Sequence, residues 1–354
     1  MDDVLVVGGG IAGLALARAL TRWDVPVTVA DRGTAPDTGL AINLPGNAIA
    51  AFAALGLAED LQKLGRPTTR REYRTRRGRL LFTVDEDAFW GPEARPRCVL
   101  RADLLTMLSE GLDDRIRTPL EVTEVHPSGE ARFTDQTQRR YGYIAGADGT
   151  HSLVRAAVDP SAPPPTAGTP GWRFLAPNPG VDCWTLWSGS GSAFLLTPVD
   201  DTQVYGYATT SSGTDMQETF DSYPPLVQQT LTTLTTVHQS PAEEIHTSTW
   251  SAGRCTVIGD AAHATAPFWA QGAALAVEDA LVLADVLTTS PWDKAGEQYQ
   301  SLRHPRITHV RAATAQFARV AALPPWFRDL LLPTLGPRTY KDTYARLRHP
   351  FPTP

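Results

Sequence analysis

Three glycines near the amino terminus have the spacing of a phosphate-binding turn. Gly8, Gly10 and Gly13 follow the apolar run Val4–Val7 in G-x-G-x-x-G order, and the Ala- and Leu-rich segment 14–20 comes next. Glycines at these positions permit a tight turn, the close approach of a pyrophosphate, and close packing of a helix on a strand. The pattern predicts a dinucleotide site, and by itself it does not distinguish FAD from NAD.

An acidic residue stands where a ribose is expected. A second apolar strand, predicted over residues 25–30, ends in Asp31, whose carboxylate can accept a hydrogen bond from a ribose hydroxyl. Strand, glycine turn, helix, strand and acid follow one another as in a βαβ nucleotide-binding unit. The start of the chain therefore predicts a Rossmann-like fold.

The patterning further along the chain predicts an α/β protein. A Rossmann-like nucleotide-binding domain is interleaved with a β-rich domain, which is recognised by short segments of alternating apolar and polar residues, and helices follow at the carboxyl terminus. The predicted boundaries are 1–70, 97–158 and 251–300 for the nucleotide-binding domain, 71–96 and 172–250 for the β-rich substrate domain, and 301–354 for a C-terminal helical, proline-rich segment.

Four local predictions concern the elements between these motifs. Residues 47–64 are expected to form one helical stretch with Asn47 as its N-cap. Residues 71–96 are expected to contain short strands that turn at Gly78, with their arginines on a solvated face. Residues 117–144 predict a β-meander. The segment 159–171, which reads DPSAPPPTAGTPG, is expected to be an irregular crossover.

Composition excludes several classes of protein. The chain has 354 residues and a formal net charge of -6, without a basic stripe interleaved with aromatic residues, so a nucleic-acid partner is not expected. Neither a signal peptide nor an apolar run of membrane length is recognisable, so we expect a cytoplasmic protein that is a monomer or a homodimer. Three widely spaced cysteines and eight histidines without ligand spacing predict reduced thiols and no metal site.

Three separated motifs together resemble one family. GGGIAG near the amino terminus is followed by GADGTHSLVR, which contains Asp148 and Arg155, and by GDAAHATAPFWAQG, which contains Asp260 and Pro267. In this order they are similar to the motifs of the single-component FAD-dependent aromatic hydroxylases, the flavoprotein monooxygenases typified by para-hydroxybenzoate hydroxylase. A weaker fourth match is VLRADLLTML, where Arg101 opens a helix. The resemblance covers about residues 1 to 310.

The resemblance implies a bound, non-covalent FAD and a set of residues around it. Asp260 would accept hydrogen bonds from cofactor hydroxyls or cap the next helix, and His263 is expected to be structural. Asp148 and Arg155 either contact the cofactor or pair with each other. The cofactor-binding residues implied are Gly8, Gly10, Ala12, Gly13, Asp31, Arg32, Arg101, Val122, Asp148, Asp260, Pro267, Gly272 and Ala273.

Aromatic side chains are the candidates for the substrate pocket. Phe268 and Trp269 are favoured because the third motif would place them beside the flavin ring. The remaining candidates come from the β-rich domain, and many aromatic residues there are expected to be ordinary core. They are Trp172, Trp184, Phe194 and Tyr205, with Trp187 and Tyr207 as further members of the set.

Three departures from the family pattern stand out. Asp31 occupies a position where the family more often has the longer Glu. Ala270 replaces a glycine of the usual G-Q-G, which puts the position and mobility of the flavin ring in question. The chain also stops soon after the predicted helices, without the thioredoxin-like domain of the larger phenol hydroxylases.

The family resemblance implies a function. NADH or NADPH, docking transiently because no second G-x-G-x-x-G is found, would reduce the FAD. Reaction with O2 would then give a flavin hydroperoxide that hydroxylates an aromatic or polycyclic small molecule, as in tailoring of a polyketide-like antibiotic. One arginine, Arg173, lies in the aromatic segment 172–207, so a bulky uncharged phenol or quinone is expected rather than a small benzoate. The alternatives are a flavin-dependent halogenase and a catalytically silent flavin-binding protein.

Overall fold

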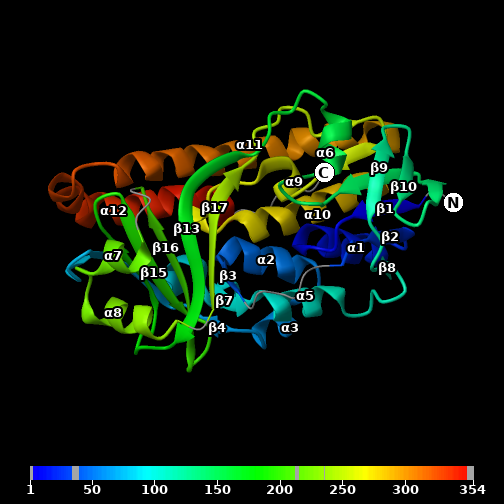
Figure 1. Cartoon of the computed structure of the whole chain (residues 1–354). Coiled ribbons are helices and arrows are strands. Elements are labelled where there is room, and N and C mark those ends of the chain that lie inside the picture. Colours follow the sequence, from blue (N-terminus) through cyan, green and yellow to red (C-terminus); the bar gives the residue numbers. More distant parts are fainter. Residues whose placement is uncertain (1–2, 34–39, 212–214, 235, 349–354) are drawn as a thin grey trace.

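A mostly parallel six-stranded sheet carries the amino-terminal glycine turn. The computed structural model describes residues 3–33, 40–211, 215–234 and 236–348 (Figure 1). The strand order of the sheet is β18-β19-β12-β1-β2-β8, and β1 pairs in parallel with both β12 and β2. The strands are β1 (Val4–Val7), β2 (Val27–Ala30), β8 (Ile116–Arg117), β12 (Tyr143–Gly146), β18 (Ser251–Ala252) and β19 (Cys255–Val257).

Two helices with buried apolar surfaces pack together beside this sheet. α1 (Ile11–Arg22) buries eight residues and α10 (Gly272–Thr289) buries twelve, as expected of helices with few polar residues. The two helices are in contact, although more than 250 residues separate their starts. Smaller elements complete this half of the molecule: α5 (Arg101–Ser109), α6 (Leu153–Val158), α9 (Asp260–His263), and a meander of β9 (Val122–His126), β10 (Glu130–Phe133) and β11 (Gln138–Arg140).

A seven-stranded sheet forms the other half of the molecule. Its order is β17-β13-β16-β15-β14-β5-β6, so that the early strands β5 and β6 join strands from much later in the chain through the parallel pair β14–β5. Gly78, at φ +87°, lies in the predicted turn between β5 and β6. The strands are β5 (Arg70–Thr75), β6 (Leu80–Asp85), β13 (Thr166–Pro177), β14 (Trp184–Ser188), β15 (Ser192–Pro198), β16 (Gln203–Thr210) and β17 (Thr236–Glu244).

The start of β13 corrects the prediction of an irregular crossover over residues 159–171. β13 begins at Thr166 and pairs with Glu244 of β17 despite the prolines and glycines in this segment. The register shifts between Ala167 and Pro170, which is how a strand accommodates a residue without an amide hydrogen. Pairing with β17 and β16 therefore overrides the local signal for irregular structure.

A small third sheet and short helices connect the two halves. Its order is β3-β7-β4, with β3 (Ala41–Leu44), β4 (Arg66–Pro67) and β7 (Arg97–Leu100). The predicted helix over residues 47–64 is two helices, α2 (Gly46–Ala54) and α3 (Ala58–Gln62), separated by Gly56 at φ +80°. The prediction that Asn47 is the N-cap of this helix is wrong. Pro45 has that position, and the Asn47 side chain is 4% exposed in the interior.

Two long helices close the structure across both halves. α11 (Trp292–Ala321) runs along the length of the molecule, and α12 (Pro325–Arg348) returns beside the seven-stranded sheet (Figure 1). Pro305 lies inside α11, and Pro333 and Pro337 lie inside α12. Residues 349–354 of the predicted C-terminal segment lie outside the described residues. Among the helices that are described, none combines the length and the apolar character needed to cross a membrane.

Candidate cofactor and substrate site

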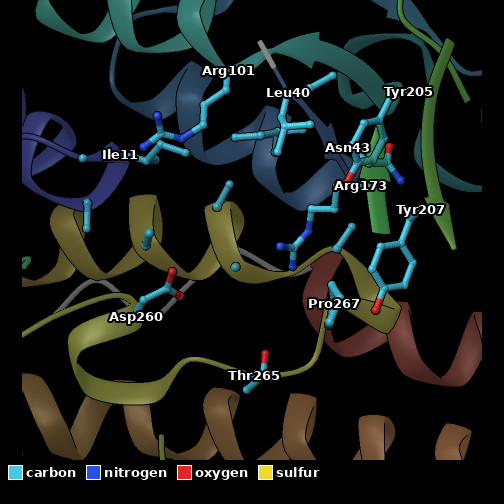
Figure 2. Close-up of a pocket in the computed structure, with 18 of the residues that line it drawn as sticks. Ile11, Leu40, Asn43, Arg101, Arg173, Tyr205, Tyr207, Asp260, Thr265 and Pro267 are labelled. Carbon is cyan, nitrogen blue, oxygen red and sulfur yellow. The ribbon is translucent and has the colours of Figure 1, made fainter. Parts of the chain in front are cut away.

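A cavity of about 750 Å³ lies where the two halves of the molecule meet. Figure 2 shows Arg101 and Ile11 at one end, Tyr205 and Tyr207 at the other, and Asp260 facing the space between them. The lining combines backbone of the glycine turn with side chains of both sheets: Gly10, Ile11, Ala12, Arg32, Leu40, Ala41, Ile42, Asn43, Arg71, Arg101, Ala147, Gly149, Arg173, Trp184, Leu195, Tyr205, Tyr207, Asp260, Thr265, Pro267, Phe268, Ala270, Gly272, Ala273 and Ala276.

Each of the three positions in the turn is occupied by glycine for a different structural reason. Gly8 has φ +105°, and a Cβ there would lie 2.5 Å from the Ala147 carbonyl oxygen. A Cβ on Gly13 would lie 1.9 Å from the Gly8 carbonyl oxygen. Gly10 differs, because its Cβ would meet no described atom within 4 Å and would instead occupy the cavity edge. Gly10 is therefore the glycine whose absent side chain leaves room for a ligand.

Two helix N-termini open onto this cavity. α1 starts after Gly10 and α10 starts after Gln271, with Gly272 and Ala273 in the lining, and no described side chain caps either helix. Uncapped amides at a helix N-terminus attract anions and acceptor oxygens. The first residues of α1 would meet the pyrophosphate, and those of α10 would meet acceptors on a flavin ring. This arrangement fits the predicted FAD.

Arg32 and Arg101 line the end of the cavity that would take the adenosine, and Asp31 directly precedes Arg32 in the chain. The Asp31 carboxylate accepts hydrogen bonds from the Gly9 amide (2.6 Å) and the Gly33 amide (2.9 Å), which hold the glycine turn against the end of β2. Arg32 is exposed and lines the cavity, and Arg101 reaches it from the first residue of α5. Asp31 thus has a structural partner in the turn beside its expected ribose role.

The Asp260 carboxyl group faces the cavity (Figure 2). Gly259, at φ +59°, is the N-cap of α9, so Asp260 does not have the alternative capping role. The protein around the carboxyl raises its pKa by desolvation, and the charge of His263 opposes that shift. A hydroxyl donor of a bound cofactor would satisfy this carboxylate.

Neither Asp148 nor Val122 is among the described residues that line this cavity. Asp148 accepts hydrogen bonds from the Ser152 hydroxyl (2.6 Å) and the Leu153 amide (2.7 Å), which satisfies the start of α6. Val122 is 7% exposed within β9. Arg155 donates to the carbonyl oxygens of Ala261 (2.9 Å) and Thr150 (2.6 Å). The backbone on either side of Asp148 lines the cavity, so this motif shapes the site through its loop.

A buried network of charged side chains contacts the backbone of the third motif at Gly259. The Asp279 carboxylate accepts hydrogen bonds from the Gly259 amide (2.8 Å) and from Arg303 Nε (2.7 Å), and it lies 2.6 Å from His263 Nε2. Burial alone would raise the pKa of Asp279, but His263 and Arg303 together lower it to about 2. The network fixes Gly259 and therefore the direction of Asp260. His263 is 3% exposed, and its burial beside Asp279 supports the structural role expected of it.

An amide network holds the start of α10. Asn47 Nδ2 donates to Gln271 Oε1 (2.9 Å) and to Glu278 Oε1 (3.2 Å), all in the interior. Arg306 Nε lies 2.6 Å from Glu278 Oε2 and neutralises it. Gln271 directly precedes the cavity-lining Gly272. The sequence predicts a cap at Asn47 and does not reveal this link from α2 to the flavin side of the site.

Ala270 has a left-handed backbone. Its φ is +53°, a region in which alanine is strained by about 1–2 kcal/mol. The preceding turn, Pro267–Trp269, ends at this residue, and both Pro267 and Ala270 line the cavity. The conformation explains why a glycine would be the ordinary residue here, and it shows that the alanine keeps the turn at an energetic cost.

The predicted aromatic residues divide between the cavity and the core. Trp184, Tyr205, Tyr207 and Phe268 line the cavity. Trp184 is 5% exposed, and its Nε1 has no described partner.

Trp172, Phe194 and Trp187 are placed elsewhere. They lie in a hydrophobic cluster with Phe220 and Val227 under α7 (Met216–Phe220) and α8 (Pro225–Thr232), on the outer face of the seven-stranded sheet. The reason is strand alternation, because Arg173 and Leu195 line the cavity and their sequence neighbours must point the opposite way. Trp269 is also absent from this lining and faces a second cavity.

Arg71 is the main lining residue that sequence reasoning missed. The arginine-rich run predicts a solvated face for it, but it is 3% exposed, and its guanidinium forms an ion pair with the buried Glu86. Burial alone would lower the pKa of Arg71, and Glu86 raises it well above the ordinary value. The Arg71 guanidinium carbon lies 5.0 Å from the centre of the Trp184 ring. The sequence does contain a signal for this burial, because alternation along the strand RREYRT places Arg71 on the same face as Tyr73.

The part of the chain that the structure describes has no group of three or more His, Cys, Asp or Glu residues that could hold a metal ion.

Comparison with known proteins identifies the family. Residues 1–314 match the family model described as FAD binding domain. The chain is 28% identical over 332 residues to 2-heptyl-3-hydroxy-4(1H)-quinolone synthase of Pseudomonas aeruginosa strain UCBPP-PA14, covering 87% of this chain and 86% of that protein. It is 30% identical over 385 residues to 3-amino-4-hydroxybenzoate 2-monooxygenase PtnB3 of Streptomyces platensis, covering 97% and 95%.

Among solved structures, Klebsiella pneumoniae HpxO complexed with FAD and uric acid matches with a TM-score of 0.81 and 25% identity, over 98% of this chain and 92% of that one. These findings confirm the predicted fold class, FAD as the cofactor and the class of enzyme, and they do not favour the halogenase alternative. The chain belongs to the FAD binding domain family and is an FAD-dependent monooxygenase of the aromatic hydroxylase type.

Proposed function

We propose that the enzyme uses NADH or NADPH to hydroxylate a bulky, uncharged phenolic or quinone-like natural product. The supporting observation is the aromatic wall of the cavity beyond Pro267, formed by Trp184, Tyr205, Tyr207 and Phe268. Flat aromatic side chains hold large ring systems by stacking and by burial of apolar surface. The substrate ring would lie between this wall and the turn that contains Pro267.

FAD, when bound, supplies the redox chemistry: it accepts two electrons from the nicotinamide, and one oxygen atom of O2 enters the ring while the other leaves as water. The chain's contribution is to bind and orient. Amides of Gly10 and Ala12 would hold the pyrophosphate, and Asp260 would accept from a cofactor hydroxyl. Amides of Gly272 and Ala273 would donate to the pyrimidine edge, where they stabilise negative charge in the reduced cofactor.

Exclusion of water is the second task of the chain. Phe268 lines the cavity, with its ring 5.1 Å from that of Phe317 on α11. An apolar side chain at this position keeps water from the reacting oxygen, so that reducing equivalents end in product rather than in hydrogen peroxide.

The charges near the ring site support an uncharged substrate. Arg71 is paired with Glu86 and would not add an unpaired cation for a carboxylate. Arg173 also lines the cavity, with its guanidinium carbon 5.9 Å from the centre of the Tyr207 ring, and its charge acts on the Asp260 carboxylate. The relatives differ in this respect, because the names of the two described above refer to an alkylquinolone and to an aminohydroxybenzoate.

A substrate screen tests the proposal. Purified holoenzyme is given NADH or NADPH with 3-amino-4-hydroxybenzoate, simple benzoates, alkylated phenols and polycyclic phenols, and nicotinamide oxidation and ¹⁸O incorporation are measured. We expect coupled turnover with the uncharged compounds. Coupled turnover of benzoates alone would refute the substrate class. Absence of nicotinamide oxidation with every compound would favour the silent flavoprotein, and a requirement for a separate reductase would contradict direct use of nicotinamide.

Replacement of Phe268 or Trp269 by Ala tests the water-exclusion argument. Phe268→Ala should keep nicotinamide oxidation but release hydrogen peroxide instead of product. Trp269 is 6% exposed and its ring packs against the rings of Phe317 (5.7 Å between centres) and Tyr344 (5.5 Å), so Trp269→Ala should also lower stability. Flavin content separates the two effects. Full coupling in both variants, with normal flavin content, would rule out this pocket assignment.

A further inference from the structure

A second cavity, of about 640 Å³, continues along the inner face of the seven-stranded sheet. Its walls are strand residues that follow the aromatic wall on the same face, the last turns of α11, and α12. Leu186 continues the row that begins with Trp184 on β14, and Tyr73 continues the row that begins with Arg71 on β5. The volume is typical of a small-molecule site.

Phe268 lines both cavities. Its ring and that of Phe317 are 5.1 Å apart, and Phe317 belongs to the second cavity. The Phe268 side chain is therefore part of the boundary between the cavities. One molecule with a ring in the first cavity can extend past Phe268 into the second.

Two polar side chains in the wall of the second cavity, Tyr340 and Arg328, already have hydrogen-bond partners, whereas Trp269 Nε1 has none among the described residues. The Tyr340 hydroxyl donates to Glu86 Oε2 (2.6 Å) and accepts from Trp90 Nε1 (3.0 Å). Arg328 donates to the carbonyl oxygens of Gly189 (2.6 Å) and Ser188 (3.1 Å). Tyr340 and Arg328 therefore place no demand on a ligand.

Most of the surface that remains for a ligand is apolar, although Ser190, Ser211 and Gln316 also lie in the lining. Phe317, Leu331 and Leu332 are only half-buried, and Leu335 is 44% exposed. When an apolar group fills a cavity lined by large apolar side chains, apolar surface is removed from water, which makes binding favourable. The chemistry of the second cavity therefore selects a hydrocarbon group.

We propose that the second cavity binds an aliphatic extension of the substrate, while the aromatic ring occupies the first cavity beside Pro267. This inference rests on the proposed function and narrows it to aromatic rings that carry a side chain of several carbon atoms. The chain length then contributes to specificity, because each methylene group transferred from water into the cavity strengthens binding by about fourfold.

The length dependence is measured with 4-alkylphenols as probes. FAD-loaded enzyme is titrated with the series from 4-methylphenol to 4-nonylphenol, and Kd is read from the change in flavin absorbance. We expect Kd to fall by about fourfold per methylene over the first several carbons and then to level off as the cavity fills. An equal Kd across the series, with 4-methylphenol still bound and hydroxylated, would overturn the inference and leave the proposed function standing. Failure of every phenol to bind would refute both.

A matched pair of variants locates the alkyl chain. Ala318→Trp places a large side chain in the lining of the second cavity, and Ala312→Trp makes the same change at an exposed alanine of α11 outside that lining. Ala318→Trp should raise the Kd of 4-nonylphenol at least tenfold without changing that of 4-methylphenol, and Ala312→Trp should change neither. Equal length dependence in both variants would show that the chain binds elsewhere. If flavin content shows that Ala318→Trp does not fold, Val320→Trp makes the same test from the same wall.

Discussion

Gly10→Ala separates what the fold requires from what the cofactor requires. The backbone at Gly10 has φ −78° and ψ −172°, which alanine adopts easily, and the new Cβ would meet no described atom within 4 Å. Alanine restricts the unfolded chain, which stabilises by about 0.4–1 kcal/mol, but it is a poorer N-cap than glycine by a similar amount. The FAD-free variant should therefore have a free energy of unfolding within about 1 kcal/mol of the parent.

The same methyl group should weaken FAD binding strongly. It would project into the space that the pyrophosphate needs in order to reach the amides at the start of α1. Loss of one charge-assisted hydrogen bond costs about 1.5–3 kcal/mol, which is about a 10- to 150-fold rise in Kd. Gly13→Ala is the contrast, because its Cβ would lie 1.9 Å from the Gly8 carbonyl oxygen and should destabilise the FAD-free protein by about 3 kcal/mol or more.

Urea unfolding of the FAD-free proteins and fluorescence titration with FAD measure both quantities. If Gly10→Ala binds FAD as tightly as the parent, the pyrophosphate does not approach Gly10 and the reasoning is wrong. If Gly13→Ala is as stable as the parent, the close packing of α1 on the turn does not limit the side chain at residue 13.

Three further predictions concern the third motif. Ala270→Gly should leave the free energy of unfolding unchanged or raise it by up to about 1 kcal/mol, because it relieves the left-handed backbone, whereas the control Ala274→Gly inside α10 should lower it by about 1 kcal/mol in urea unfolding. Asp279→Asn should lower the free energy of unfolding by about 1–3 kcal/mol, since it removes one of the two carboxylates that pair with the buried Arg303 and leaves only Glu278, and an unchanged urea midpoint would contradict this. The pKa of Asp279 is about 2 in the folded protein, below its unfolded value. The stability that its ionised carboxylate contributes is therefore complete above about pH 5 and is lost on acidification. Between pH 5 and pH 2 the free energy of unfolding of the parent should fall by about 2 kcal/mol more than that of Asp279→Asn.

The features that sequence predicted best are local in the chain. The glycine turn, the strand before it and Asp31 lie within 31 residues, and their spacing is set by backbone geometry that any such turn shares. Pro267 and Phe268 could be predicted for the same reason, because a short motif fixes their distance from Asp260.

Pairing between distant segments decided what sequence could not predict. Alternation shows that Trp172 and Arg173 face opposite sides of a strand, but only the assembled sheet shows which side meets the cofactor cavity. Arg71 lies in an arginine-rich run, which predicts exposure to solvent. Its burial depends on Glu86 and on Tyr340, which is more than 250 residues away. The prediction for Asn47 likewise rests on its neighbours in the chain, whereas its partner is Gln271.

The contact between α1 and α10 has a consequence for biosynthesis. Gly272 is translated more than 250 residues after Gly10, yet both border one cavity. A nascent chain that stops before α10 holds half of a binding surface, so it cannot gain the stability that a bound ligand gives the native state. Bound FAD would therefore stabilise only chains that contain α10. Proteases should degrade chains that lack α10 whatever the FAD supply, and should degrade chains that contain it more slowly as the FAD supply rises.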